Sequence, residues 1–176
     1  MPCRRPFVCA AAFALLSCTA AFGADEAAEI RALITRADLP AALERAERAV
    51  AAKPKDASLR FMRAVVLMDM QRDPEALVQF TELSQEYPEL PDPYNNIALL
   101  LARAGRLNEA LQALQAALRN DPGHRTARAN LGQVHLMLAV QAWEQASAGA
   151  GVQDANLLRR LEGARALLAP PARAAR

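Results

Sequence analysis

Small and apolar residues recur along this chain with a fixed long period. Alanine stands at positions 42, 76 and 110, and proline stands at positions 54, 88 and 122, so both residue types return every 34 residues. Independent sets that share one period indicate an internal repeat, because each structural unit buries the same face against its neighbour. Two further sets have the same step: Ala46, Phe80 and Leu114, and then Ala49, Leu83 and Ala117.

The segment from Tyr94 to Pro122 shows what each position of one unit does. Ala98 and Ala110 are small enough to let two helix backbones approach closely where they cross. Gly105 can adopt the left-handed backbone conformation that ends a helix. The proline stops the second helix because it lacks a backbone N–H. We therefore expect a helix, a turn and a second helix in this unit.

This register resembles the tetratricopeptide repeat family over residues 24 to about 145. The resemblance implies an all-α fold, a right-handed solenoid of about three and a half helix-turn-helix repeats with a C-terminal capping helix. The repeats are expected at about 23–56, 57–90, 91–124 and 125–150, and the capping helix at 153–169. The repeat domain then covers residues 24–169, and residues 170–176 form a flexible tail.

Two units lack the turn glycine. Ala37 and Gln71 stand at the positions that correspond to Gly105. Asp38 and Asp73, each followed closely by a proline, are expected to start the second helix of these units as N-caps. The first helix of the opening unit is expected to begin near residue 25.

The fourth unit departs from the pattern. It has no turn signal near residue 139 and stays apolar through Trp143, so one long helix is expected there. The break is expected at residues 148–151, after which Asp154 or Asn156 caps a last helix. That helix is amphipathic, and we expect its leucines at 157, 158, 161, 167 and 168 to cover the last apolar face of the solenoid.

Residues 1–23 have the three parts of a secretory signal peptide. Arg4 and Arg5 form a charged region, residues 7–16 are apolar, and small residues precede Ala24. The apolar run is too short to span a bilayer. We therefore expect an exported protein located in the periplasm.

All three cysteines, at positions 3, 9 and 18, lie within this leader, so the exported chain is expected to fold without disulfides. Cys18 offers an alternative to soluble release. The residues before it resemble the lipobox of bacterial lipoproteins, in which the cysteine is acylated. An outer-membrane lipoprotein anchored at Cys18 therefore stays open beside a soluble periplasmic protein.

Composition and charge narrow the classes of function. Alanine makes up 41 of the 176 residues and aromatic residues only 5%, which favours helices packed closely on helices. The chain has 21 basic and 19 acidic residues and no basic block, so nucleic acid is not expected as a partner. Membrane contact is expected only through the alternative lipid anchor.

Few side chains are suited to catalysis. His124 follows Pro122 and Gly123 in a loop and is expected to be solvated, whereas His135 takes the place of a packed aromatic and is expected in the core. The sequence contains no glycine-rich phosphate loop or nucleophile motif. Its acidic residues have the spacing of helix caps and solvated faces. We expect no catalytic residues, metal or cofactor, and therefore a protein that is not an enzyme.

The resemblance also implies which residues face a partner, because the first helix of each tetratricopeptide unit lines the concave groove. Asn96 and Asn130 take the same position in neighbouring units, and their amides are suited either to hold the backbone of an extended peptide or to brace the helices. The basic clamp by which some relatives hold a terminal carboxylate is not matched. The expected groove residues are Phe61, Met62, Val65, Asp69, Asn95, Asn96, Leu99, Arg103, Asn130, Gln133 and Met137.

Residues 86–96 and 130–143 resemble exported tetratricopeptide proteins of Gram-negative bacteria. This resemblance implies a non-catalytic adaptor of the cell envelope that holds a peptide or helix of another protein in its groove. Two alternatives stay open. One is a lipid-anchored scaffold for cell-wall enzymes at the outer membrane, and the other is a solenoid that associates with copies of itself as a homo-oligomer.

Overall fold

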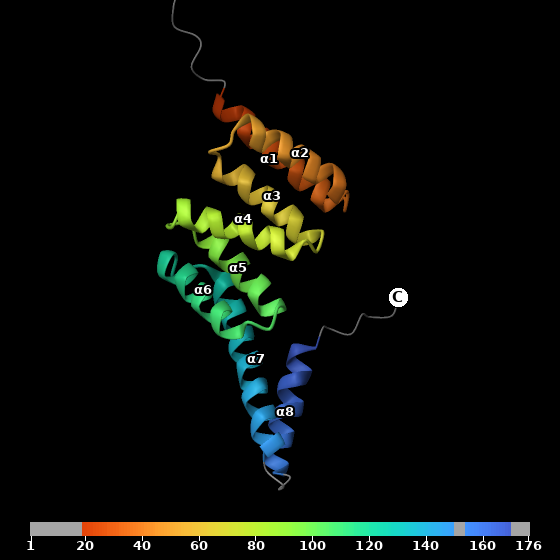
Figure 1. Ribbon diagram of the computed structural model, residues 1–176, viewed down its shortest axis with the longest axis vertical. Coiled ribbons are helices and arrows are strands. Elements are labelled where there is room, and N and C mark those ends of the chain that lie inside the picture. Colours follow the sequence, from red (N-terminus) through yellow and green to blue (C-terminus); the bar gives the residue numbers. More distant parts are fainter. Residues whose placement is uncertain (1–18, 150–153, 170–176) are drawn as a thin grey trace, which may run out of the picture.

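The computed structural model describes residues 19–149 and 154–169, which form eight helices and no strand (Figure 1). The expectations for residues 1–18, 150–153 and 170–176 lie outside the described residues. In chain order the helices are α1 (Thr19–Thr35), α2 (Leu39–Ala52), α3 (Ala57–Asp69), α4 (Asp73–Glu86), α5 (Pro91–Arg103), α6 (Leu107–Asn120), α7 (Arg125–Gly149) and α8 (Ala155–Leu168).

Consecutive helices pair as the 34-residue period predicts. α1 packs on α2, α3 on α4 and α5 on α6, and each pair also packs on the next. The alanines at 42, 76 and 110 are each 0% exposed, because the helices of a pair meet there without room for a larger side chain. Ala98 of α5 lies in the same apolar cluster as Ala110 of α6. The predicted all-α repeat architecture is therefore confirmed.

The turn inside each repeat has the same backbone geometry whether or not glycine is present. The φ angle is 75° at Gly105, 58° at Ala37 and 60° at Gln71. In all three turns the next residue donates its N–H to a carbonyl five residues earlier, as in the Leu101 to Arg106 bond of 2.9 Å. Helix packing thus holds two residues with a Cβ in the left-handed region, at a cost of about 1 kcal/mol each.

Replacing Gln71 by glycine is expected to raise the free energy of unfolding by about 0.5 to 1 kcal/mol, because glycine adopts this φ angle without steric strain. The side chain of Gln71 is exposed, so little packing is lost. The matched change is Gly105→Ala, which adds a Cβ with nothing within 4 Å and is expected to destabilise by a similar amount. Denaturant titration measures both. Shifts of the same sign would contradict the shared turn geometry.

The second helix of the first repeat starts with the N-cap that the sequence predicts, whereas the second helix of the second repeat does not. Asp38 is the N-cap of α2, and its carboxylate accepts a hydrogen bond from the N–H of Ala41 at 3.3 Å. Asp73, expected to cap α4, is instead the first residue of that helix, and Arg72 before it makes no side-chain cap. The Arg72 guanidinium donates to Glu75 at 2.7 and 2.6 Å, which holds the pKa of that carboxyl below its usual range. The start of α4 is therefore stabilised by the negative charges of Asp73 and Glu75, which interact favourably with the helix dipole, and not by a side-chain cap.

α1 begins at Thr19, earlier than the expected start near residue 25, so it crosses the predicted leader cleavage site before Ala24. The buried residues Glu26, Ala27 and Ile30 all follow that site. The last two belong to an apolar cluster shared with α2 and α3. The part of α1 after the site is therefore packed into the first repeat.

α7 is the long helix that the sequence predicts for the fourth unit. Its first half packs on α6, with Ala127 fully buried in the shared apolar cluster. Its second half pairs with α8, and the two helices project from the stack as a hairpin (Figure 1). Asp154 caps α8 by accepting the N–H of Asn156 at 2.8 Å. An ion pair of 2.6 Å between Arg165 and Glu144 joins the two helices.

Candidate functional site

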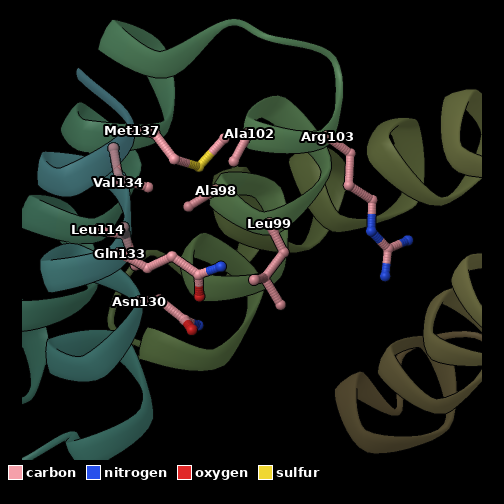
Figure 2. Close-up of a pocket in the computed structure, with 9 residues that line it drawn as sticks. All are labelled: Ala98, Leu99, Ala102, Arg103, Leu114, Asn130, Gln133, Val134 and Met137. Carbon is pink, nitrogen blue, oxygen red and sulfur yellow. The ribbon is translucent and has the colours of Figure 1, made fainter. Parts of the chain in front are cut away.

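A pocket of about 230 Å³ opens between α5 and α7, which are the first helices of the third and fourth units (Figure 2). We refer to it as the α5–α7 pocket. It brings together five of the eleven groove residues that the sequence predicts, namely those at positions 99, 103, 130, 133 and 137. The residues that line it are Ala98, Leu99, Ala102, Arg103, Leu114, Asn130, Gln133, Val134 and Met137.

The α5–α7 pocket has an apolar interior and amides at its edge. Leu114 and Val134 are buried, and Leu99 and Met137 are half-buried. The amide of Gln133 points across the pocket toward Leu99 (Figure 2). An apolar cavity with a small number of placed polar groups is the usual composition of a binding site. This pocket can accept one large apolar side chain and hydrogen-bond the backbone beside it.

The predicted asparagine ladder takes a different form. Asn130 donates from Nδ2 to Oδ1 of Asn95 at 2.8 Å, so this amide pair links α7 to α5. Asn95 is 6% and Asn96 9% exposed, and Asn96 does not line the α5–α7 pocket. The prediction that Asn95 and Asn96 lie on an open groove wall is therefore wrong, because the close packing of α5 against its neighbours buries both side chains. Asn130 acts as the brace, and only its remaining Oδ1 and N–H are left for a ligand.

Replacing Asn130 by alanine is expected to lower the free energy of unfolding by about 1 to 2 kcal/mol, because the buried Oδ1 of Asn95 loses its donor. Gln133→Ala is the matched control on the same helix, since its amide is exposed and its loss is expected to change stability by less than about 0.5 kcal/mol. Denaturant titration of the two variants measures the difference. Equal effects would contradict the bracing role.

The remaining predicted groove residues divide between core and surface. Met62 is 7% exposed and packs in the cluster of α1, α2 and α3, so its assignment to the groove is corrected: this face of α3 turns toward the first repeat. Phe61 and Val65 are half-buried, and the centroids of the Phe61 and Phe80 rings are 5.4 Å apart. Asp69 is exposed. Phe61 also lines a second pocket of about 360 Å³ with Ala57, Ser58, Leu83, Leu90, Asp92 and Pro93.

Arg103 lines the α5–α7 pocket and acts on two carboxylates, those of Asp73 and Asp69; we call these three groups the Asp69–Arg103–Asp73 cluster. Nη1 of Arg103 lies 3.3 Å from Oδ1 of Asp73. Partial burial raises the pKa of Asp69, and the positive charge of Arg103 opposes that rise. Two carboxylates therefore share one guanidinium, which leaves one negative charge of the cluster without a partner.

His124 lies in the predicted loop, but neither histidine has the solvent exposure that the sequence predicts. His124, expected to be solvated, has a side chain that is only 13% exposed. Its Nδ1 accepts the N–H of Ala127 at 3.1 Å and its Nε2 donates to Asp92 at 2.9 Å, so the ring joins the first turn of α7 to that of α5. His135, expected in the core, is exposed because α7 presents a different face to α6. Both differences follow from side-chain direction, which the repeat spacing does not specify.

Four residues of the α5–α7 pocket were not among the predicted site residues: Ala98, Leu114, Ala102 and Val134. The repeat period marks the first two as core positions and gives no sign that the core is open there. A cavity arises from the spacing of two helices, and that spacing depends on all the side chains between them.

The described part of the chain lacks two other kinds of site. Its histidine, cysteine, aspartate and glutamate side chains form no group of three or more that could hold a metal ion. Neither stretch, 19–149 or 154–169, contains a helix of the length and apolar character that crossing a membrane requires.

Comparison with known proteins connects this geometry to a family. Sequence profiles of the tetratricopeptide repeat match residues 27–91 and 91–124. No curated protein matches the sequence significantly. Among solved structures, TTC0263, a thermophilic tetratricopeptide protein of Thermus thermophilus, is 20% identical with a TM-score of 0.63, and the likeness covers 83% of this chain and 82% of that one.

Two further similar structures are complexes with a partner. The TPR2B domain of yeast Sti1, in a complex with Hsp70, is 22% identical with a TM-score of 0.59 over 66% of this chain and 98% of that one. The second tetratricopeptide domain of human RPAP3, in complex with the HSP70 peptide SGPTIEEVD, is 23% identical with a TM-score of 0.57 over 62% of this chain and 92% of that one. At these identities the likeness establishes the fold.

Proposed function

Because this chain belongs to the tetratricopeptide repeat family, we propose that it is a non-catalytic adaptor that binds a peptide or helix of a partner protein along α3, α5 and α7. The family's repeats are protein-interaction modules. The α5–α7 pocket is the observation that carries the proposal, because it combines an apolar interior with the free amide of Gln133. The complexes of the yeast relative with Hsp70 and of the human relative with an HSP70 peptide support it.

The geometry indicates how such a segment binds. An apolar side chain of the partner enters between Leu99 and Met137, and the hydrophobic effect supplies most of the affinity. The amides of Asn130 and Gln133 then have donors and acceptors for the partner's backbone. Because backbone groups are common to all sequences, side-chain specificity comes from the pocket and from the charges beside it.

Site-directed photocrosslinking tests this function. A photoreactive residue in place of Gln133 is expected to crosslink one partner, whereas the same residue in place of the exposed Gln112 on α6 is expected to give none. A second change, Ala102→Trp, fills the pocket and is expected to abolish the crosslink without a large change in melting temperature. Equal labelling from both positions, or labelling that the filled pocket does not reduce, would contradict a partner in this groove.

We also propose that the adaptor works in the bacterial cell envelope. The signal-like pattern of residues 1–23 supports export, and residues buried in α1 after position 24 would be kept on cleavage. A lipid-anchored scaffold for cell-wall enzymes is the alternative, through Cys18. Cell fractionation of Cys18→Ser separates the two: an unchanged soluble pool supports the released form, and loss of membrane association supports the lipoprotein.

A further inference from the structure

The charge beside the α5–α7 pocket is unbalanced. Arg103 comes from α5 and lines the pocket, and its guanidinium is directed away from the apolar interior (Figure 2). There it pairs with Asp73 at 3.3 Å. Within residues 19–149 and 154–169, the carboxylate of Asp69 makes no hydrogen bond or ion pair, and its only charge partner is the same Arg103. The cluster therefore carries one uncompensated negative charge.

Neither Asp92 nor the α7 side of the pocket changes this balance. Asp92, in the first turn of α5, is engaged with His124 at 2.9 Å. The residues of α7 that line the pocket are Asn130, Gln133, Val134 and Met137, and none of them is ionisable. A bound segment thus meets neutral amides on the α7 side and an acidic group on the α3 side.

The distance from the α5–α7 pocket to Asp69 determines how many residues of a bound segment lie between the two. The α5–α7 pocket lies between two helices, and Asp69 lies on α3, the next first helix along the stack. If successive first helices are spaced as packed helices are, at about 8 to 10 Å, the step from the middle of the pocket to α3 covers about one and a half such spacings. An extended chain advances about 3.3 Å per residue. A segment that crosses the helices therefore travels about three to five residues from the pocket to Asp69.

Resting on the proposed function, we propose that the bound segment carries an apolar side chain for the α5–α7 pocket and, about three to five residues away, a lysine or arginine that pairs with Asp69. A cation there completes the pairing of two carboxylates that share one guanidinium. An acidic residue at the same place meets the carboxylates of Asp69 and Asp73, and Arg103, the cation that they share, is already paired with Asp73. The groove thus selects a basic partner segment.

Selection from a random peptide library displayed on phage, with the whole protein as bait, tests this inference. The enriched peptides are expected to combine one large apolar residue with a basic residue at the stated spacing. Binding of a selected peptide is then compared with its Lys→Gln and Lys→Glu versions. Asp69→Asn is expected to weaken the lysine peptide about threefold and to leave the glutamine version unchanged. The control variant Glu162→Gln removes the same charge on α8 and is expected to change neither.

The outcomes separate this inference from the proposed function. Peptides that lose binding in Ala102→Trp yet show no basic preference, or prefer acidic residues, would overturn the inference and leave the groove as the binding site. Peptides that bind equally well when the pocket is filled, or the absence of any enriched peptide, would overturn the proposed function and this inference with it. A basic preference that Asp69→Asn does not reduce would overturn the assignment to Asp69.

Discussion

Replacing Phe80 by alanine is expected to lower the free energy of unfolding by about 3 to 5 kcal/mol. Phe80 is the largest fully buried side chain of the protein as described, at 0% exposure. It lies in the apolar cluster that joins α3, α4 and α5, and Phe61 contacts its ring. Truncation loses the transfer free energy of the ring and leaves a cavity in the middle of the solenoid. Denaturant unfolding followed by circular dichroism measures the loss.

Two controls on the same residue and the same helix make this result specific. Phe80→Leu keeps most of the volume and is expected to cost about 1.5 kcal/mol or less. Val78→Ala, on the same helix, alters a side chain that is 57% exposed and is expected to change stability by less than about 0.5 kcal/mol. If Phe80→Ala cost no more than Val78→Ala, α4 would not pack as described.

Replacing Ala110 by leucine is expected to destabilise by about 3 kcal/mol, because overpacking forces the two helices apart. Ala110 is 0% exposed at the contact of α6 with α5, in the cluster that holds Ala98. A larger side chain there displaces α5, which carries Leu99 and Arg103 of the α5–α7 pocket. The variant is therefore expected to lose partner binding as well as stability, measured by unfolding and by the photocrosslink at position 133.

The matched change is Ala113→Leu, one turn away on the same helix at a partly buried position. It is expected to cost less than half as much, since a side chain there can extend toward solvent. If both substitutions cost the same, or if Ala110→Leu melts like the original protein, then the 34-residue register does not mark the helix crossing.

Much of the fold follows from the sequence because the repeat imposes a physical requirement. Two helices can cross closely only where the side chains between them are small. Because the crossing recurs in every repeat, alanine recurs at the same position of each repeat. Ala42, Ala76 and Ala110 therefore locate the three helix pairs. The long α7 was predictable for the complementary reason that the fourth unit has no turn residue near position 139. The turns at Ala37 and Gln71 show that this requirement outweighs local preference for glycine.

The site was less predictable because it depends on side-chain direction. The family register places Met62 and Asn95 on the groove wall. Both side chains are buried, because the faces of α3 and α5 that carry them pack against neighbouring helices. Asn130 bonds Asn95 on the facing helix, a pairing between residues 35 positions apart that a 34-residue ladder does not indicate. Gln133 and Met137, on the α7 side, both line the α5–α7 pocket, where Gln133 is exposed and Met137 is half-buried.

The most direct test of the central claim follows the methionine methyl groups by nuclear magnetic resonance while a groove-selected or crosslinked peptide is added. Met137 lines the α5–α7 pocket, whereas Met62 lies in the core of the first repeat, so one spectrum contains both the probe and its internal control. Binding in the groove predicts that the Met137 signal shifts in a saturable way and the Met62 signal stays in place. A peptide that binds while Met137 stays unchanged would contradict the α5–α7 pocket as the partner site.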